Sequence, residues 1–302
     1  MFNVVKNRNY FFGFSLLLTI LSIISIFTWK LNLSIDFRGG SNIEISLPNA
    51  EENLNKIREI GRESGLKIDS VRTSDNNKVI IRTDDLSTNE HSLFIENLKS
   101  EFSDKVAEEN YQTVGPVVSR DLTNKTIWSV VIASIAIILY IAYAFRRTPK
   151  PASSWRFGLA AVAALIHDLI ITTGFVSIVG HFYSWMQVDA LFITALLTIM
   201  GFSVHDTIVV FDRLRENLIR KPESDIETLA NDSIIQTLSR SINTSLTTIL
   251  VLTALFLIGG ESIRHFVLIL IAGITFGTYS SIFIASIILV VWSKNGNDLS
   301  HR

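Results

Sequence analysis

Two His-Asp pairs lie inside long apolar stretches of this 302-residue sequence: His167-Asp168 and His205-Asp206. An ionisable side chain near the middle of a bilayer costs about 3 kcal/mol even on lenient insertion scales. Such residues therefore face the interior of a helix bundle, where they commonly carry protons, ions or ligands. We expect Asp168 and Asp206 to be functional carboxylates, and the alternative is that they only clamp helices together.

A third candidate is Arg240, which lies a few residues before the apolar stretch of residues 246–258. Polar residues recur around it at helical spacing and form one stripe, which comprises Gln236, Thr237, Asn243, Thr244 and Thr247. Lipid cannot satisfy such a stripe, so it should face protein or water. Asp206 and Arg240 lie on consecutive helices of opposite direction, at similar depths. We expect them to form a direct or water-bridged pair; alternatively, Arg240 extends to the lipid headgroups.

Other chemistry is poorly represented among the residues of this chain. His167 and His205 are interpreted as hydrogen-bonded interior residues, with a proton relay as the alternative, because imidazole titrates near neutral pH. Neighbours on a helix point about 100° apart, so neither His-Asp pair can chelate a metal through one face. The sequence contains no cysteine, no phosphate-binding G-x-x-x-x-G-K-[ST] and no hydrolase motif. We expect no metal, no cofactor and no enzymatic activity.

The apolar residues, 48% of the chain, are concentrated in runs that could cross a membrane. A span needs about 20 mostly apolar residues. Six segments meet this requirement, the fifth only with its flanks: Tyr10–Trp29, Ile127–Phe145, Phe157–Val179, Val188–Phe211, Leu246–Ile258 and His265–Trp292. The first lacks a small-x-small cleavage site and is interpreted as an uncleaved anchor. A net charge of −1 gives no basic surface for nucleic acid.

The distribution of Lys and Arg predicts the orientation of the spans. These residues cluster before the first span, between the second and third, and after the fourth, at Lys6, Arg8, Arg146, Arg147, Lys150, Arg156, Arg213, Arg215, Arg220 and Lys221. The positive-inside rule then places both termini in the cytoplasm. The expected domains are 1–29 (cytoplasmic N-terminus and first span), 30–126 (extracytoplasmic) and 127–302 (five further spans).

Segment 30–126 has the pattern of a small α+β domain. Alternating apolar residues indicate strands and helical spacing indicates helices. The expected elements are strand Ser41–Leu47, helix Glu51–Ser64, strands Lys67–Arg72 and Val79–Arg82 around a turn at Asp75–Asn77, helix Leu86–Phe102 and strand Tyr111–Val118. The order strand–helix–strand–strand–helix–strand predicts a ferredoxin-like fold.

Two further patterns concern the helices on the cytoplasmic side and in the last span. Within the cytoplasmic segment 212–242, a capping-box sequence precedes an apolar helical face made of Ile226, Leu229, Ala230, Ile234 and Leu238. We expect an amphipathic helix that lies in the membrane interface and leads into the fifth span. Gly273 and Gly277 form a G-x-x-x-G motif, which permits close helix–helix approach.

Five stretches carry a family resemblance when they are taken together. They are Asp36-Phe37-Arg38-Gly39-Gly40 after the first span, Val114-Gly115-Pro116 before the second, His167-Asp168, the stretch from Gly201 to Asn217, and the stretch from Leu238 to Thr248. In this order, and at these positions in the topology, they resemble the SecF proteins of the bacterial SecD/SecF protein-export family. The resemblance covers essentially the whole chain. Arg38, Phe202 and His205 differ from the residues that are commoner in the family.

This resemblance implies an RND-like membrane fold in the bacterial inner membrane and a separate SecD partner. It also implies association with the SecYEG channel and use of the proton-motive force to help unfolded polypeptides emerge. The family's proton-handling positions correspond to Asp206 and Arg240, and Asp168, His167 and His205 are further candidates. The alternative function is half of an RND-type proton-driven exporter of small molecules or lipids, although such proteins carry twelve spans and two external domains.

The resemblance also draws attention to the two ends of the external domain. Asp36, Gly39 and Gly40 form its entry turn, and Gly115 and Pro116 form its exit. Glycine tolerates backbone angles that other residues avoid, so we expect the entry turn to act as a hinge for the domain. The alternative is a tight turn that is needed only for folding.

Overall fold

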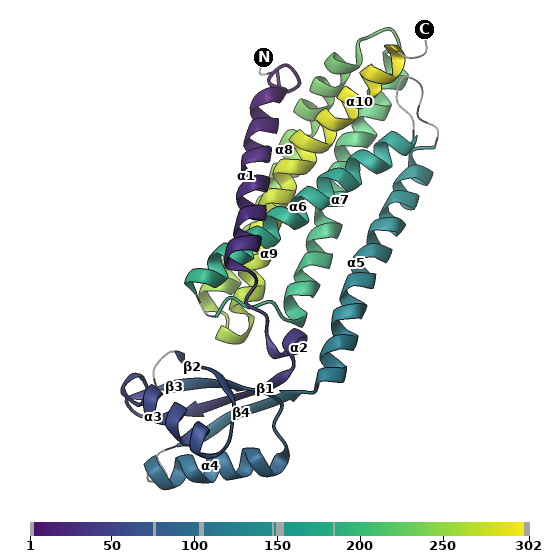
Figure 1. Cartoon of the computed structure of the whole chain (residues 1–302). Helices are drawn as coiled ribbons and strands as arrows, with labels where there is room; N and C mark the ends of the chain where they lie inside the picture. The colour runs from purple at the N-terminus through teal and green to yellow at the C-terminus, as the bar shows by residue number, and fades with distance from the viewer. Residues whose placement is uncertain are drawn as a thin grey trace. The chain divides into compact units, whose positions relative to one another are not determined.

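The structure, a computed structural model, describes residues 3–74, 77–102, 106–146, 148, 154–183 and 185–298 (Figure 1). It divides into two compact units. The membrane unit comprises residues 1–32 and 128–302, and the sheet unit comprises residues 33–127. The predicted turn at Asp75–Asn77 lies partly outside the described residues, and Asn77 has a φ of 74°.

Within the residues that the structure describes, six helices are long and apolar enough to cross a membrane. They are α1 (Arg8–Trp29), α5 (Pro116–Ala144), α6 (Ser154–Phe182), α7 (Ala190–Arg220), α8 (Ile226–Ile258) and a last helix in three consecutive parts, α9 (Glu261–Tyr279), η1 (Ser280–Ala285) and α10 (Ser286–Asp298). Each predicted span falls on one of these helices, so the prediction of six spans is confirmed. The segment η1 is a π-helix, a wider turn that is frequent at functional sites.

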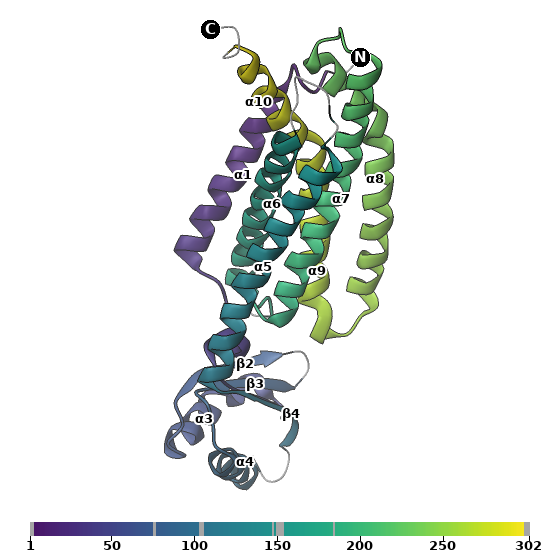
Figure 2. The same cartoon turned by 90° about the vertical axis from the view of Figure 1, so that its right-hand side faces the viewer.

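The first part of the last helix, α9, lies beside α7 (Figures 1 and 2), and small residues face α7 along it. A Cβ atom on Gly273 would lie 2.1 Å from Ile199 Cδ1, and one on Gly277 would lie 3.3 Å from the Cβ of Ser203. Both glycines of the predicted G-x-x-x-G motif therefore face α7 at close range. Without a Cβ at these positions, the two backbones can approach, which is how small residues promote helix packing in membranes.

The first half of α8 differs from the prediction. Its apolar face, which includes Leu229 and Ile234, is buried in the core of the membrane unit, and the helix continues without a break from Ile226 to Ile258. The prediction that this face lies in the lipid interface is therefore wrong. An apolar helix face can be buried either in lipid or against other helices, and here it is buried against the other helices of the membrane unit.

In the sheet unit, the described residues form a four-stranded antiparallel sheet with the order β2-β3-β1-β4. Its elements are α2 (Ile35–Arg38), β1 (Gly40–Ser46), α3 (Ala50–Glu63), β2 (Ile68–Ser74), β3 (Lys78–Thr83), α4 (Thr88–Phe102) and β4 (Ala107–Val114). Helices α3 and α4 cover one face, and α2 lies on the opposite side (Figure 1). Ile43, Val79, Ile81 and Phe94 are buried between the sheet and its helices. This confirms the ferredoxin-like prediction.

The bounds of the elements in the sheet unit differ from the expectation by a few residues, and one short helix is additional. The last strand ends at Val114 rather than at 118, because Pro116 already begins α5. Proline has no N–H to donate to a ladder but fits the first turn of a helix, where no donor is needed. The short helix α2 was not expected; Ser34 caps it by accepting a hydrogen bond from Asp36 N at 3.2 Å.

Candidate site in the membrane unit

Asp168 is fully buried, at 0% exposure, in a chain of hydrogen bonds that joins four segments of the membrane unit. Ser203 Oγ on α7 donates to Asp168 Oδ2 at 2.6 Å, and His167 Nδ1 lies 3.0 Å from Asp168 Oδ1. His167 Nε2 lies 2.6 Å from Ser15 Oγ on α1. On the other side, Ser281 Oγ in η1 donates to Ser203 O at 2.7 Å. A neutral imidazole that donates through Nδ1 and accepts through Nε2 satisfies both of its contacts.

Asp206 is the second buried carboxylate, at 4% exposure. Ser245 Oγ on α8 donates to Asp206 Oδ2 at 3.3 Å, and Thr278 Oγ1 on α9 donates to Ser245 Oγ at 2.6 Å. Asp206 therefore has a hydroxyl partner, which is itself hydrogen-bonded. His205, the neighbour of Asp206, is exposed and does not enter this network.

Arg240 does not pair with Asp206 in this structure, which corrects the expected contact. Its side chain is exposed and, across the described ranges, its guanidinium has neither a hydrogen bond nor an ion pair. Ser245 is five positions after Arg240, so their side chains point about 140° apart around α8. The face of α8 that meets its neighbours carries Thr237, Ser241 and Ser245, whereas Arg240 lies on the other side.

The two carboxylates belong to one polar layer of the membrane unit. Ser203 and Asp206 lie one turn apart on α7, and Thr278 and Ser281 lie one turn apart on the last helix. Almost every polar partner in this layer is a hydroxyl group. A hydroxyl can donate to an ionised carboxylate or accept from a protonated one, so the layer can accommodate a proton on either acid.

The hydroxyl partners are the residues that sequence reasoning missed. They are Ser15, Ser203, Ser245, Thr278 and Ser281. Their sequence signal is weak, because isolated Ser and Thr are common in apolar helices, where they bond to their own backbone. In the part of the chain with described coordinates, no group of three or more His, Cys, Asp or Glu could hold a metal.

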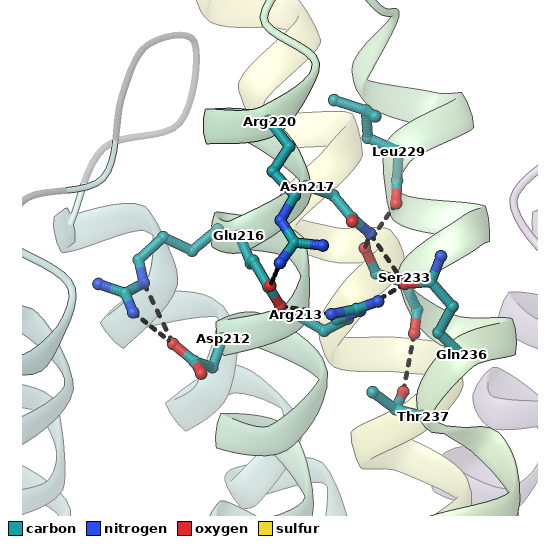
Figure 3. Close-up of polar contacts among 10 residues, drawn as sticks. Asp212, Arg213, Glu216, Asn217, Arg220, Leu229, Ser233, Gln236 and Thr237 are labelled. Atoms are coloured by element: carbon teal, nitrogen blue, oxygen red, sulfur yellow. Dashed lines mark hydrogen bonds and ion pairs between the residues drawn. The ribbon is translucent and has the colours of Figure 1, made fainter.

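A second polar network joins the end of α7 to the start of α8 (Figure 3). Asn217 Nδ2 donates to Ser233 Oγ at 2.8 Å and to Gln236 Oε1 at 3.3 Å, and Arg213 Nε donates to the same Gln236 oxygen. Arg213 also pairs with Glu216. Asn217 is 7% exposed and its bond to Ser233 is buried between the two helices, whereas the bond between Arg213 and Gln236 lies at the surface. These bonds hold α8 against α7 about three turns from Asp206.

The glycine pair at the entry to the sheet unit is required by local geometry. Gly39 has a φ of 76° and Gly40 a φ of 115°, both in the region that favours glycine. A Cβ on Gly40 would lie 2.4 Å from Thr83 O. Gly40 is also the first residue of β1 and pairs with Val114, next to Gly115 and Pro116. Gly40 is therefore part of the sheet, and a hinge at this entry would have to lie before it.

The fold and the site together describe a polytopic, RND-like membrane protein with buried carboxylates. The family model for "Protein export membrane protein SecD/SecF, C-terminal" matches residues 94–295, and the model for the SecD/SecF GG motif matches residues 24–47. The chain belongs to the SecD/SecF protein-export family. The GG motif match contains Asp36, Gly39 and Gly40, on which the resemblance rested.

Individual relatives agree with this assignment. The chain is 40% identical over 298 residues to the protein translocase subunit SecF of Anaerolinea thermophila, covering 97% of this chain and 95% of that protein. It is 35% identical to the translocase subunit SecDF of Bacillus subtilis, of which it covers 37%. The crystal structure of SecDF from Thermus thermophilus, described as translocon-associated, superposes with a TM-score of 0.82 at 34% identity. That match covers 97% of this chain and 39% of the larger one.

Proposed function

We propose that this chain is a SecF-type subunit that couples proton flow to late steps of polypeptide export. The supporting observation is the polar layer of the membrane unit, in which Asp168 and Asp206 are buried and bonded to hydroxyl groups. A buried carboxylate that can exchange a proton is the minimum requirement for a proton-driven machine. The relatives that match almost the whole chain are translocase subunits, which favours export over the small-molecule exporter.

The partners follow from the same relatives. SecDF proteins join a further, longer part to a part that this chain matches over almost its full length. We infer that a separate SecD chain supplies the corresponding part here, in the bacterial inner membrane. The SecYEG channel and the translocating unfolded polypeptide complete the proposed assembly. The chain needs no cofactor for this role.

In the proposed mechanism, Asp206 alternates between two partners. The structure contains the state in which Ser245 is the partner, while Arg240 faces away. Because Arg240 lies about 140° around α8 from Ser245, a pair with Asp206 requires α8 to rotate or slide against α7. A guanidinium group beside a carboxylate favours its ionised form, so a pair with Arg240 favours ionised Asp206, whereas protonated Asp206 is compatible with the hydroxyl partner. Proton binding would then select between two arrangements of α7 and α8.

This mechanism is tested by replacing the carboxylate while keeping its shape. In cells that lack the native copy, Asp206→Asn should abolish gradient-dependent export, because the amide keeps the contact with Ser245 but binds no proton. Assembly with the partner chain should survive, which affinity purification measures. Asn243→Ala, at an exposed position on α8, is the control. Full export by Asp206→Asn would show that the carboxylate only holds the helices together.

The proposed orientation places both termini in the cytoplasm and the sheet unit outside the membrane. Because the chain has no cysteine, single cysteines report accessibility without background. Ser92 on α4 and Ser224 between α7 and α8 are both exposed. An impermeant thiol reagent added to intact spheroplasts should label Ser92→Cys and not Ser224→Cys. The opposite labelling pattern would reverse the proposed topology.

A further inference from the structure

A pocket of about 290 Å³ lies in the sheet unit, between the turn that contains α2 and the strands β2 and β3. Arg82, near the end of β3, lines this pocket, although only 8% of the residue is exposed. Asn42 on β1 and Ser70 on β2 are its neighbours in the sheet. A buried guanidinium normally has a carboxylate or several acceptors around it, because an uncompensated charge is costly away from water.

Arg82 lacks such a partner among the residues that the structure describes. Within the described residues its guanidinium makes neither a hydrogen bond nor an ion pair, and Asp69, which raises its pKa, is the nearby acid. Asp69 is already paired with Arg38, with Nη1 and Oδ2 2.9 Å apart. Burial, followed by the neighbouring Arg72 guanidinium, lowers the pKa of Arg82 to about 10. The side chain is therefore still charged at neutral pH.

The other charges that line the pocket cancel one another. Lys67 pairs with Asp84 across 3.3 Å, and Arg38 pairs with Asp69. Both of these pairs are largely exposed and can open at little cost. Arg82 thus provides the uncompensated positive charge, and Arg38 and Lys67 are exposed, ion-paired cations at the rim. This arrangement fits an oxyanion that a guanidinium can bind through two parallel hydrogen bonds.

The position of the pocket in the chain indicates the source of the oxyanion. Leu33, which lines the pocket, follows Trp29 by four residues, and Trp29 is the last residue of α1. Four residues span at most about 14 Å. Trp29 stacks on His181 with 4.8 Å between ring centroids, as expected for an aromatic anchor at the edge of a membrane. The covalent chain therefore keeps this wall of the pocket within reach of the headgroup layer, where phosphate groups are abundant.

We propose that this pocket binds the phosphate group of an anionic lipid headgroup through Arg82. Binding would fix the entry to the sheet unit at the membrane surface, and it does not depend on the proposed proton chemistry. An acidic segment of polypeptide is a different class of ligand. The pocket favours the lipid, because its wall is tied to the end of a membrane span.

The test uses the full chain in detergent and native mass spectrometry. Phosphatidylglycerol and phosphatidylcholine are titrated separately, with inorganic phosphate and a glutamate-rich peptide as competing probes. One phosphatidylglycerol should bind more tightly than phosphatidylcholine. Arg82→Gln should weaken its binding at least tenfold, and Arg82→Lys should weaken it less, because an ammonium keeps the charge but not the fork of donors. Lys99→Gln is the control. It removes an exposed charge on α4, on the side of the sheet opposite to α2, and should leave the affinity for phosphatidylglycerol unchanged.

Asp69→Asn gives a result that misfolding cannot imitate. Removing this acid takes away a nearby negative charge and releases Arg38, so phosphatidylglycerol should bind roughly three- to tenfold more tightly. The proposal is overturned if neither Arg82→Gln nor Asp69→Asn changes lipid affinity. It is also overturned if inorganic phosphate binds as tightly as the lipid, or if the peptide alone depends on Arg82.

Discussion

Gly174 on α6 is the position where one added methyl group should separate α1 from the rest of the membrane unit. A Cβ at this position would lie 2.5 Å from Ser22 Cα and 2.2 Å from Ser22 Cβ. Ordinary contact between carbon atoms needs about 3.5 Å. Ser22 Cα belongs to the backbone and cannot rotate away, so Gly174→Ala should force α1 to move by about 1 Å.

A shift of this size would break three hydrogen bonds. Ser25 Oγ donates to Gly174 O at 3.1 Å, Ser177 Oγ donates to Ser25 O at 3.0 Å, and Ser15 Oγ lies 2.6 Å from His167 Nε2. Interhelical hydrogen bonds in membranes contribute about 0.6 kcal/mol each. Overpacking costs about 1–3 kcal/mol more. Gly174→Ala should therefore lower the free energy of unfolding by about 3–5 kcal/mol.

The measurement is unfolding of the purified chain in mixed micelles, titrated with SDS and followed by circular dichroism. Gly13→Ala on α1 is the matched control, because nothing lies within 4 Å of the added Cβ. Alanine is the better helix former, so this control should be neutral or stabilising by up to about 1 kcal/mol. If Gly174→Ala and Gly13→Ala unfold at the same SDS fraction, α1 is not held against α6 in the way that the structure shows.

Two further predictions concern the sheet unit and the junction of α7 with α8. Gly40→Ala should destabilise the sheet unit by about 2 kcal/mol or more, because the new Cβ would lie 2.4 Å from Thr83 O. Limited proteolysis of the full chain measures this loss of stability. Gly65→Ala is the control: Gly65 also has a positive φ but has open space around it, so this substitution should destabilise the unit less. Asn217→Ala removes two hydrogen bonds from the α7–α8 junction and should cost about 1–2 kcal/mol in SDS unfolding, whereas the exposed Asn243→Ala should cost almost nothing.

The six spans and the ferredoxin-like order could be predicted because each rests on a strong constraint. The thickness of the bilayer sets the length of an apolar run, and strand alternation reports one buried face. Boundaries were less accurate, as at β4, where Pro116 ends the extended segment earlier than expected. Strand propensity alone does not determine which residue is the last to pair with the neighbouring strand.

The partner of Asp206 could not be predicted from the sequence. The height of a residue in the membrane does not determine which side of its helix faces the neighbouring helix. The opposite directions of the two consecutive helices predicted that Asp206 and Arg240 lie at similar heights. The sequence contains two polar faces on α8, one through Arg240 and one through Ser245. Only the packing of the helices decides which of the two faces meets α7. The packing selects the small side chains of Ser241 and Ser245 for the close contact. A bulky guanidinium would hold the helices apart.

The two units share only two covalent connections, at residues 33 and 127, and the helices that lead into them differ in their contacts with the membrane unit. Most of the apolar surface of α5 is exposed, whereas α1 packs along α6 through Ser15, Ser22 and Ser25. Of these, Ser15 contacts the imidazole that is hydrogen-bonded to Asp168. A change of charge at Asp168 would alter what His167 donates and accepts, and so the contact with α1. The connection through α1 is therefore the one that hydrogen bonds join to the buried carboxylate of Asp168, and Gly174→Ala disturbs that connection without touching either acid.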